Sequence, residues 1–330
     1  MSITNVLVVG SGGMARAHLQ AMLLMPDTTH VVGFVEPNPG SQSATRVMFI
    51  ERDLECPPFF DTIPQFLESG IQADAALICT PHKYHLEDTV TCLRAGLDVC
   101  LEKPMVLNVA EAEAVIRVRD ETARLLMIAF PGSLSPAIWE AKRLLRSGAI
   151  GRVTAINAFV HQNWKAFTVG TWRQDPDISG GGFLFDTGSH MVNTVVELLG
   201  EGVAQVSALL NQRGTPVEIA SSVSGISSGG VLFSLTGAGD SIHCTSEITV
   251  FGEAGVLKTG IWGESLSLKL EDDKAFQPVP YARSSGPWEQ FLNVRAGTLE
   301  NPCPPEIGLR FARLMDLIRE SASRGRTVSA

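Results

Sequence analysis

The sequence predicts an α/β protein of two domains: an N-terminal doubly wound parallel sheet, then an α/β domain with a large open, mostly antiparallel sheet. Up to about residue 130, apolar runs alternate with helical patterns, as in parallel sheets whose crossovers are helices. After Gly151 apolar residues alternate with polar ones, as in strands with one solvated face. A chain of 330 residues is also too long for one ordinary core. We therefore divide the chain into residues 1–130 and 131–330.

Five continuous apolar runs are predicted to form the parallel sheet of the first domain. They are Val6–Val9, Val31–Val35, Ala75–Cys79, Val99–Leu101 and Leu126–Phe130. Continuous runs are typical of strands that are buried on both faces, so we expect helices on both sides, joined by right-handed crossovers.

The first run leads directly into GSGGMA, residues 10–15, and then into a helical pattern that continues through Met25. Gly10 would permit a tight turn, and Gly12 would let the backbone approach a pyrophosphate. Ala15 takes the place of a third glycine. The helix N-terminus would favour the anion. We predict Gly10, Gly12, Gly13 and Met14 as cofactor-binding residues, with a purely structural turn as the alternative.

The second run ends in Glu36, which lies 26 residues after Gly10. A carboxylate there can accept hydrogen bonds from ribose hydroxyls and would repel a 2′-phosphate. Glu36 therefore favours NAD over NADP as the cofactor. Arg46 is the residue that could fold back and reverse this preference.

Two further run ends carry polar residues. AGLDVCLEKP ends in Glu102, Lys103 and Pro104, and packing explains a charged lysine poorly at a place where open α/β sheets bind ligands. The alternative is a surface salt bridge. Thr80 and Pro81, followed by His85, come after another run and are predicted to contact the cofactor or substrate.

Asp186, His190 and Asn193 follow a run of three glycines at offsets of four and three, which place them on one face of a helix that begins near Thr187. A histidine exchanges protons near neutral pH, and a carboxylate can orient its ring. The alternative is a helix-capping aspartate beside a histidine whose hydrogen bonds are structural.

The remaining elements of the second domain are five alternating strands and two helices. We predict strands at Val153–His161, Val203–Leu210, Val231–Leu235, Ile248–Phe251 and Leu266–Leu270. Ile138, Ala141 and Leu145 share one helix face, and Gly148 ends that helix. The last helix, near Pro305–Ser323, has an apolar stripe that covers a core, and one option is that it packs back on the first domain.

Composition excludes several classes of function. A net charge of −9 without a basic cluster argues against nucleic-acid binding. Six scattered cysteines, without CxxC pairs, suggest neither a metal site nor a disulfide framework, and fit buried thiols in a reducing compartment. No apolar run approaches the ~20 residues of a membrane span. We expect a soluble, cytoplasmic protein.

Together these motifs resemble the family of glucose-fructose oxidoreductase, inositol dehydrogenase and MocA-like proteins (Gfo/Idh/MocA). The resemblance covers almost the whole chain. It rests on GSGGMA, Thr80-Pro81 with His85, AGLDVCLEKP, SGAIGRV, Trp172-Arg173, GGGFLFDTGSH and FGEAGVLK. It implies a Rossmann domain, a bound NAD(P), hydride transfer at a hydroxyl-bearing carbon of a sugar, inositol or related polyol, and a homodimer or homotetramer formed through the C-terminal sheet.

The resemblance also implies roles for single residues. Lys103 would hold the nicotinamide and stabilise the developing alkoxide, His190 would accept the hydroxyl proton, and Asp186 would bind a substrate hydroxyl or orient His190. Asn193 would bind substrate, although many family members carry an acidic residue in its place. Trp172 and Arg173 lie in a stretch whose glycines and Pro176 suggest a loop over the site, and such side chains suit sugar faces and hydroxyls. The alternative is a core tryptophan and a structural arginine. Two alternatives remain: an enzyme that cleaves or isomerises glycosides by transient redox without net cofactor turnover, and a non-catalytic nucleotide-sensing regulator.

Overall fold

The computed structural model describes residues 2–330, which form two compact units. Unit 1 contains the chain up to Val106 together with Ala110–Ala129 and Ser285–Pro305, whereas unit 2 contains Leu107–Val109, Phe130–Ser284 and the chain from Glu306 onward.

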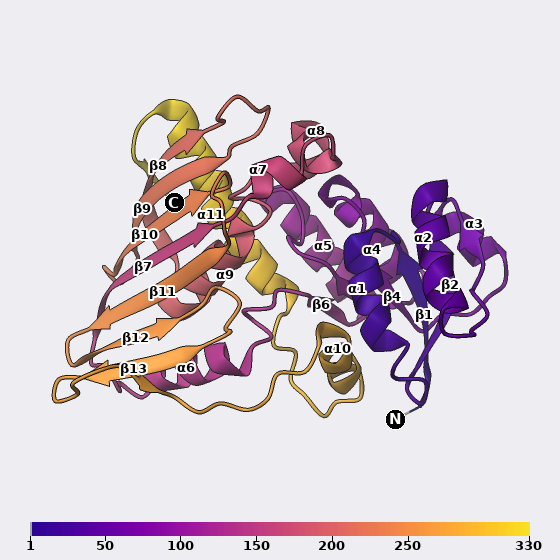
Figure 1. The fold of residues 1–330 in the computed structure, drawn as a ribbon, viewed down its shortest axis with the longest axis horizontal. Helices are drawn as coiled ribbons and strands as arrows, with labels where there is room; N and C mark the ends of the chain where they lie inside the picture. Colours follow the sequence, from indigo (N-terminus) through magenta and orange to yellow (C-terminus); the bar gives the residue numbers. More distant parts are fainter. Residues whose placement is uncertain (1) are drawn as a thin grey trace. The chain divides into compact units, whose positions relative to one another are not determined.

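Unit 1 is built on a six-stranded parallel sheet with the strand order β3-β2-β1-β4-β5-β6 (Figure 1). Its elements are β1 (Thr4–Val9), α1 (Gly13–Met22), β2 (Thr29–Val35), α2 (Pro39–Ile50), β3 (Phe59–Phe60), α3 (Ile63–Glu68), β4 (Ala75–Ile78), the short helix η1 (His82–Tyr84), α4 (His85–Arg94), β5 (Asp98–Leu101), α5 (Val109–Thr122), β6 (Leu126–Ile128) and α10 (Pro287–Arg295). The strand order reverses between β1 and β4, and sheets of this kind bind ligands beyond the strand ends at such a reversal. Gly10 and Thr80 follow these two strands closely.

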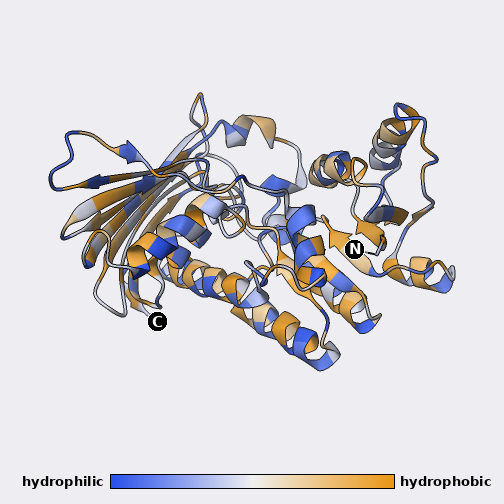
Figure 2. Ribbon diagram, turned by 90° about the horizontal axis from the view of Figure 1, so that it is seen from below, coloured by the Kyte–Doolittle hydropathy of each residue, from blue (hydrophilic) through white to orange (hydrophobic). Residues whose placement is uncertain are grey.

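The core of unit 1 explains why its strands read as continuous apolar runs. The four consecutive residues Val6–Val9 are each at most 1% exposed, so both faces of β1 are covered. Figure 2 shows these strands in mostly hydrophobic colours and helices that carry both kinds of residue. The predicted parallel sheet is confirmed.

Helix α10 was not predicted. It is attached to unit 1 by two long-range hydrogen bonds: Trp288 Nε1 donates to Thr29 Oγ1 at 2.9 Å, and Arg295 Nε donates to Asp98 Oδ2 at 2.8 Å. The last helix, for which packing back on the first domain was one option, belongs almost entirely to unit 2, and that option stays a prediction. These two side chains are seven positions apart in α10, and neither signals its distant partner in the sequence.

Unit 2 is built on a nine-stranded sheet with the order β14-β13-β12-β11-β7-β10-β9-β8-β15, in which only the β7–β10 pair is parallel. Its elements are α6 (Pro136–Arg146), β7 (Val153–His161), α7 (Trp164–Phe167), η2 (Trp172–Gln174), α8 (Pro176–Ser179), α9 (Gly188–Leu199), β8 (Val203–Asn211), β9 (Ala220–Ser227), β10 (Leu232–Ala238), β11 (Thr245–Gly252), β12 (Gly255–Thr259), β13 (Leu266–Leu270), β14 (Gln277–Pro278), α11 (Pro305–Arg324) and β15 (Val328–Ser329). The predicted open, mostly antiparallel sheet is confirmed.

The nine-stranded sheet has one helix-covered face and one open face. Helices α6, α9 and α11 lie on the covered side (Figure 1), and Ala208 N of β8 donates to Ser321 Oγ of α11 at 2.9 Å. On β7, Ile156, Ala158 and Val160 are at most 1% exposed. Asn157 points to the other side, where its Nδ2 donates to Ser234 Oγ at 2.9 Å. This alternation is the pattern that predicted β7 with its observed bounds.

The thiols depart from the expectation of general burial. All six cysteines are free, but only Cys92, Cys100 and Cys303 are buried, and Cys244 is exposed. Burial was therefore a wrong prediction for Cys244, which lies just before β11. Over residues 2–330, no three His, Cys, Asp or Glu side chains are grouped so that they could hold a metal ion. No helix within the same residues has the length and apolar character needed to cross a membrane.

Candidate functional site

The turn after β1 is shaped for an anion. Gly10 has φ +82°, and a Cβ there would lie 2.9 Å from the backbone of Cys79 and Thr80, so only glycine fits. Gly12 precedes α1, which has no side-chain cap, and a Cβ on Gly12 or Gly13 would meet nothing within 4 Å. The turn thus leaves room beside Gly12 and Gly13, and the first N–H groups of this ten-residue helix suit the pyrophosphate of a dinucleotide.

Glu36, at the end of β2, is joined to the glycine turn. Its Oε2 accepts from Ser11 N at 2.8 Å, and its Oε1 accepts from Asn38 N at 2.9 Å. These backbone donors fix the carboxylate at the place predicted to meet a ribose. Arg46, which could have opposed this charge, instead stacks on Phe59, with its guanidinium carbon 4.5 Å from the ring centre.

The segment after β4 is tied to the segment after β5 by His85. The ring of His85 is buried, with Nε2 2.8 Å from the carbonyl oxygen of Thr80 and Nδ1 2.9 Å from that of Pro104. Burial lowers the pKa of His85, and a neutral imidazole has one N–H, so it donates to one carbonyl at a time. The geometry favours a positioning role for His85. Direct contact with a ligand by Thr80, Pro81 or His85 stays a prediction.

Asp88 is an unpredicted titratable group in this region. Thr80 Oγ1 donates to its Oδ2 at 2.7 Å, and burial raises the pKa of Asp88 from its ordinary 3.8 to about 6. The folded protein therefore binds this proton more tightly than the unfolded chain does. Asp88 lowers stability progressively as the pH rises from about 4 to about 6, and its ionised form remains a penalty above that range.

We therefore expect Asp88→Asn to raise the free energy of unfolding at pH 7.5, by up to about 2–3 kcal/mol, and to change it little at pH 4. The amide oxygen of asparagine can still accept from Thr80. Urea unfolding of both proteins across this pH range measures the difference. An equal effect at both pH values would show that ionisation of Asp88 does not limit stability.

Glu102 links the Glu-Lys-Pro segment to α1. His18 Nε2 lies 2.7 Å from Glu102 Oε1, and Lys103 N donates to Glu102 Oε2 at 3.1 Å. Burial alone would raise the pKa of Glu102. The hydrogen bond with His18 and the positive charge of that histidine instead hold the pKa of Glu102 below its ordinary value. The Lys103–Pro104 peptide bond is cis. Glu102 thus connects the predicted catalytic lysine to the helix that follows the glycine turn.

His18 was missed by the sequence analysis. It lies on α1 between the buried residues Ala15, Leu19 and Met22. A histidine on a buried, apolar helix face needs a polar partner. The helical spacing of the apolar residues around His18 could have indicated that such a partner exists. The sequence could not show that the partner is Glu102, 84 residues away.

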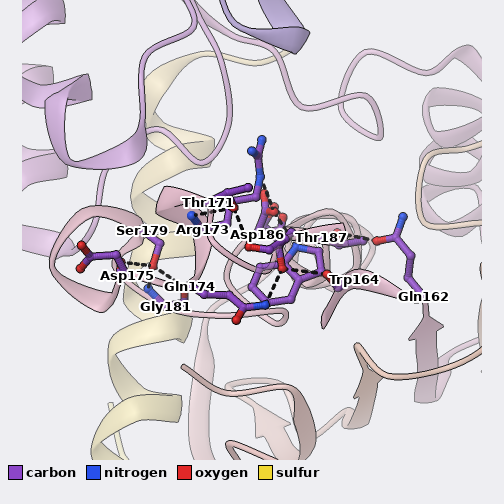
Figure 3. Close-up of polar contacts among 12 residues, drawn as sticks. Gln162, Trp164, Thr171, Arg173, Gln174, Asp175, Ser179, Gly181, Asp186 and Thr187 are labelled. Atoms are coloured by element: carbon purple, nitrogen blue, oxygen red, sulfur yellow. Dashed lines mark hydrogen bonds and ion pairs between the residues drawn. The ribbon is translucent and has the colours of Figure 1, made fainter. Parts of the chain in front are cut away.

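In unit 2, Asp186 is held by one side chain from α7 and one from η2. Trp164 Nε1 donates to Asp186 Oδ2 at 2.8 Å, and Arg173 Nε donates to the same oxygen at 3.0 Å (Figure 3). The guanidinium of Arg173 also stacks on the Trp172 ring, 4.5 Å from its centre. The predicted cluster of Trp172, Arg173 and Asp186 is thus contiguous. Its roles toward a substrate stay predictions.

His190 lies in the first turn of α9, one turn after Asp186. Its ring is edge-on to Phe130, with 6.5 Å between ring centres, and tilted against Trp262 at 5.7 Å. The two aromatic rings restrict where the imidazole can move. Trp262 comes from the turn between β12 and β13 and was not predicted as a site residue.

Asn193 points into a polar network within unit 2. Its Nδ2 donates to Ser133 Oγ at 2.8 Å, and Ser133 Oγ donates to Glu197, which is also paired with Lys142. Asn193 is 1% exposed. The contact in the structure is therefore with Ser133, and substrate binding by Asn193 stays a prediction.

Comparisons with known proteins identify the family. A family model described as an oxidoreductase family with an NAD-binding Rossmann fold matches residues 4–130, and a model of the GFO/IDH/MocA C-terminal domain matches residues 138–258. The chain belongs to the GFO/IDH/MocA oxidoreductase family. The resemblance, the fold class and the prediction of an oxidoreductase with a nicotinamide-cofactor domain are confirmed for this family member.

Relatives of this GFO/IDH/MocA chain include named dehydrogenases. Oxidoreductase P35 of Formosa agariphila is 27% identical over 76% of the chain and 80% of its own length. D-xylose 1-dehydrogenase (NADP+) of Haloarcula marismortui is 28% identical over 56% of the chain. The matched region spans 53% of that enzyme, about half of it. A levoglucosan dehydrogenase, solved in complex with NADH and L-sorbose, shares the fold with a TM-score of 0.85 and 22% sequence identity. The match covers 100% of this chain and 99% of the levoglucosan dehydrogenase chain.

Proposed function

We propose that this protein is an NAD(P)-dependent dehydrogenase that transfers a hydride between the nicotinamide and a hydroxyl-bearing carbon of a sugar, inositol or related polyol. The observation that carries the proposal is the pair Asp186 and His190 at the start of α9, with the carboxylate fixed by Trp164 and Arg173. Family membership supports it, as do relatives whose names specify sugar dehydrogenases.

In this proposal each residue has one task. His190 accepts the proton of the reacting hydroxyl, and its ring is kept in place by Phe130 and Trp262. Asp186 presents a carboxylate to a second hydroxyl of the substrate. Lys103 supplies a positive charge that stabilises the developing alkoxide. The cofactor, when bound, accepts the hydride.

The cofactor would be held by the glycine turn and Glu36, and we propose NAD as the preferred form. The proposal is supported by the Glu36 carboxylate, which is fixed beside the glycine turn and would repel a 2′-phosphate, and by Arg46, which is engaged with Phe59. Relatives differ in this respect, because the xylose dehydrogenase is named for NADP+ and the levoglucosan dehydrogenase structure contains NADH.

We expect Glu36→Gln to raise the ratio of kcat/KM with NADP to kcat/KM with NAD by about tenfold or more, since the substitution removes the charge that repels the 2′-phosphate. Glutamine retains an acceptor for Ser11 N. Glu36→Asp is the matched control, since it keeps the charge and should keep the preference. An unchanged ratio in Glu36→Gln would mean that other groups select the cofactor.

We further propose a homodimer or homotetramer that forms through the open face of the nine-stranded sheet. Leu209, Leu232 and Phe251 lie on this face and are 74%, 58% and 40% exposed. Exposed apolar side chains on a broad sheet favour association with a second copy. Light scattering of the purified protein gives the mass of the assembly, and a monomer would refute the proposal.

The decisive test of the dehydrogenase is nicotinamide reduction, followed by absorbance with NAD or NADP and a panel of inositols, aldoses, anhydrosugars and glycosides. Lys103→Met serves as a control, since methionine resembles lysine in length but has no charge. Reduction that is lost in this variant supports the proposal. If the protein binds NAD but does not reduce it with any of these compounds, the proposal is overturned.

A further inference from the structure

Trp262 packs against His190 and has no role assigned so far. The ring centres of Trp262 and His190 are 5.7 Å apart with an interplanar angle of 56°. Trp262 is partly exposed, whereas the fully buried tryptophans Trp164 and Trp288 are each 1% exposed. It therefore presents an aromatic surface to solvent beside the predicted proton acceptor.

The turn that carries Trp262 is fixed at several points. Thr194 Oγ1 of α9 donates to the carbonyl of Ile261 at 2.8 Å, and Ser135 Oγ, at the start of α6, donates to the carbonyl of Gly263 at 3.0 Å. Trp262 N itself donates to Glu264 Oε2 at 3.1 Å. The main chain on both sides of Trp262 is thus bonded to the helix that bears His190 and to its neighbour.

Close packing restricts the same turn further. Gly263 has φ +72°, and a Cβ there would lie 2.2 Å from Ser135 Oγ. A Cβ on Gly260 would lie 1.9 Å from the carboxyl group of Glu264. At Gly263 both the positive φ and the Ser135 side chain exclude other residues, whereas at Gly260 the Glu264 side chain would have to move aside. The hydrogen bonds on both sides of Trp262 hold this turn in one conformation. A rigid turn presents a side chain in one place, which is what a binding surface requires.

The indole N–H of Trp262 also differs from those of three other tryptophans. Trp139, Trp164 and Trp288 each donate Nε1 to an acceptor within the chain. Among the described residues, Trp262 Nε1 has no such acceptor. A partly exposed indole with an available N–H can cover an apolar face of a ligand and donate to one hydroxyl at its edge.

We propose that Trp262 is a specificity-determining residue that stacks on the C–H face of a cyclic sugar or cyclitol whose hydroxyl reacts at His190. This inference rests on the proposed dehydrogenase function. A pyranose or cyclohexane ring has a continuous apolar face of axial C–H groups, whereas an open-chain polyol has no such fixed face. Trp262 therefore selects for ring substrates, and its contribution is to binding rather than to proton transfer.

The test compares Trp262→Leu with the parent protein on cyclic substrates (inositols and pyranoses) and on open-chain polyols such as sorbitol. We expect kcat/KM for cyclic substrates to fall about tenfold, mostly through KM, and that for open-chain polyols to change less than about twofold. The pH profile of kcat should stay unchanged. Equal losses for both classes, or a shifted pH profile, would overturn the inference, because Trp262 would then act by positioning His190.

A matched control loosens the same turn without removing the indole. Tyr281 OH donates to the carbonyl of Glu264 at 3.2 Å, and Tyr281→Phe removes only that bond. It should leave the ratio of cyclic to open-chain kcat/KM unchanged. If it mimics Trp262→Leu, the effect comes from the turn and the inference fails.

Binding measurements separate this inference from the proposed function. If the parent protein reduces no nicotinamide, the dehydrogenase proposal fails, and calorimetric titration with the same inositols and pyranoses then tests Trp262 alone. Binding that weakens about tenfold in Trp262→Leu supports the inference. Binding that is equal in both proteins, or undetectable in the parent, overturns it.

Discussion

Replacement of His190 by asparagine is expected to lower kcat by about 10² to 10⁴-fold, the usual contribution of a positioned general acid or base. Asparagine keeps a polar side chain of similar reach but cannot take a proton at neutral pH. The His190 ring is buried against Phe130 and Trp262, but asparagine is polar and smaller, so it fits without a clash and we expect the fold to survive. Steady-state nicotinamide reduction at saturating substrate measures the loss.

The matched control for this variant is His161→Asn. His161 lies at the end of β7 and packs edge-on against Phe159 at 5.5 Å between ring centres, away from α9. We expect its kcat to match that of the parent protein. If His190→Asn keeps kcat within about tenfold of the parent, another group accepts the proton and our assignment is wrong.

The sequence predicted the fold well where burial leaves a simple pattern. The strands of unit 1 read as continuous apolar runs because both faces are covered, and β7 alternates because one face is open. Strand β9 was not predicted from its sequence, ASSVSGIS. Serines and Gly225 stand there in place of most of the β-branched residues that signal a strand. Strand β9 pairs along its length with β8 and β10, so the neighbours rather than its own composition make it a strand.

The candidate site was predictable only where local motifs carry it. Gly10 and Glu36 follow from strand ends, and Asp186 and His190 follow from helical spacing. The partners of these residues were not predictable. His18 contacts Glu102, which lies 84 residues further along the sequence. Thr194 bonds to the turn that carries Trp262 across 67 residues. Such contacts depend on how the elements pack, and a single sequence contains no direct signal of that packing.

The glycine run before Asp186 illustrates a role that sequence could not define. Gly182, the last glycine of the run, is packed directly on the β8–β9 loop. Phe183 N donates to the carbonyl of Glu218 at 2.8 Å, and Gly182 N donates to Glu218 Oε2 at 2.7 Å. A Cβ on Gly182 would lie 2.0 Å from the carbonyl oxygen of Glu218 and 2.8 Å from its nitrogen. The run is therefore a close backbone contact that sets the position of Asp186.

We expect Gly182→Ala to lower the free energy of unfolding by about 3 kcal/mol or more, at the upper end of the cost of overpacking, because the obstructing atoms are backbone. Activity should also fall, since Asp186 N donates to the carbonyl of Gly182 at 2.9 Å and would move with it. Gly202→Ala is the control: a Cβ there meets nothing within 4 Å, so its stability should change by no more than about 0.5 kcal/mol. Urea unfolding of both variants decides the matter. Equal stability would mean that the β8–β9 loop yields to a methyl group, and that Asp186 does not depend on this contact for its position.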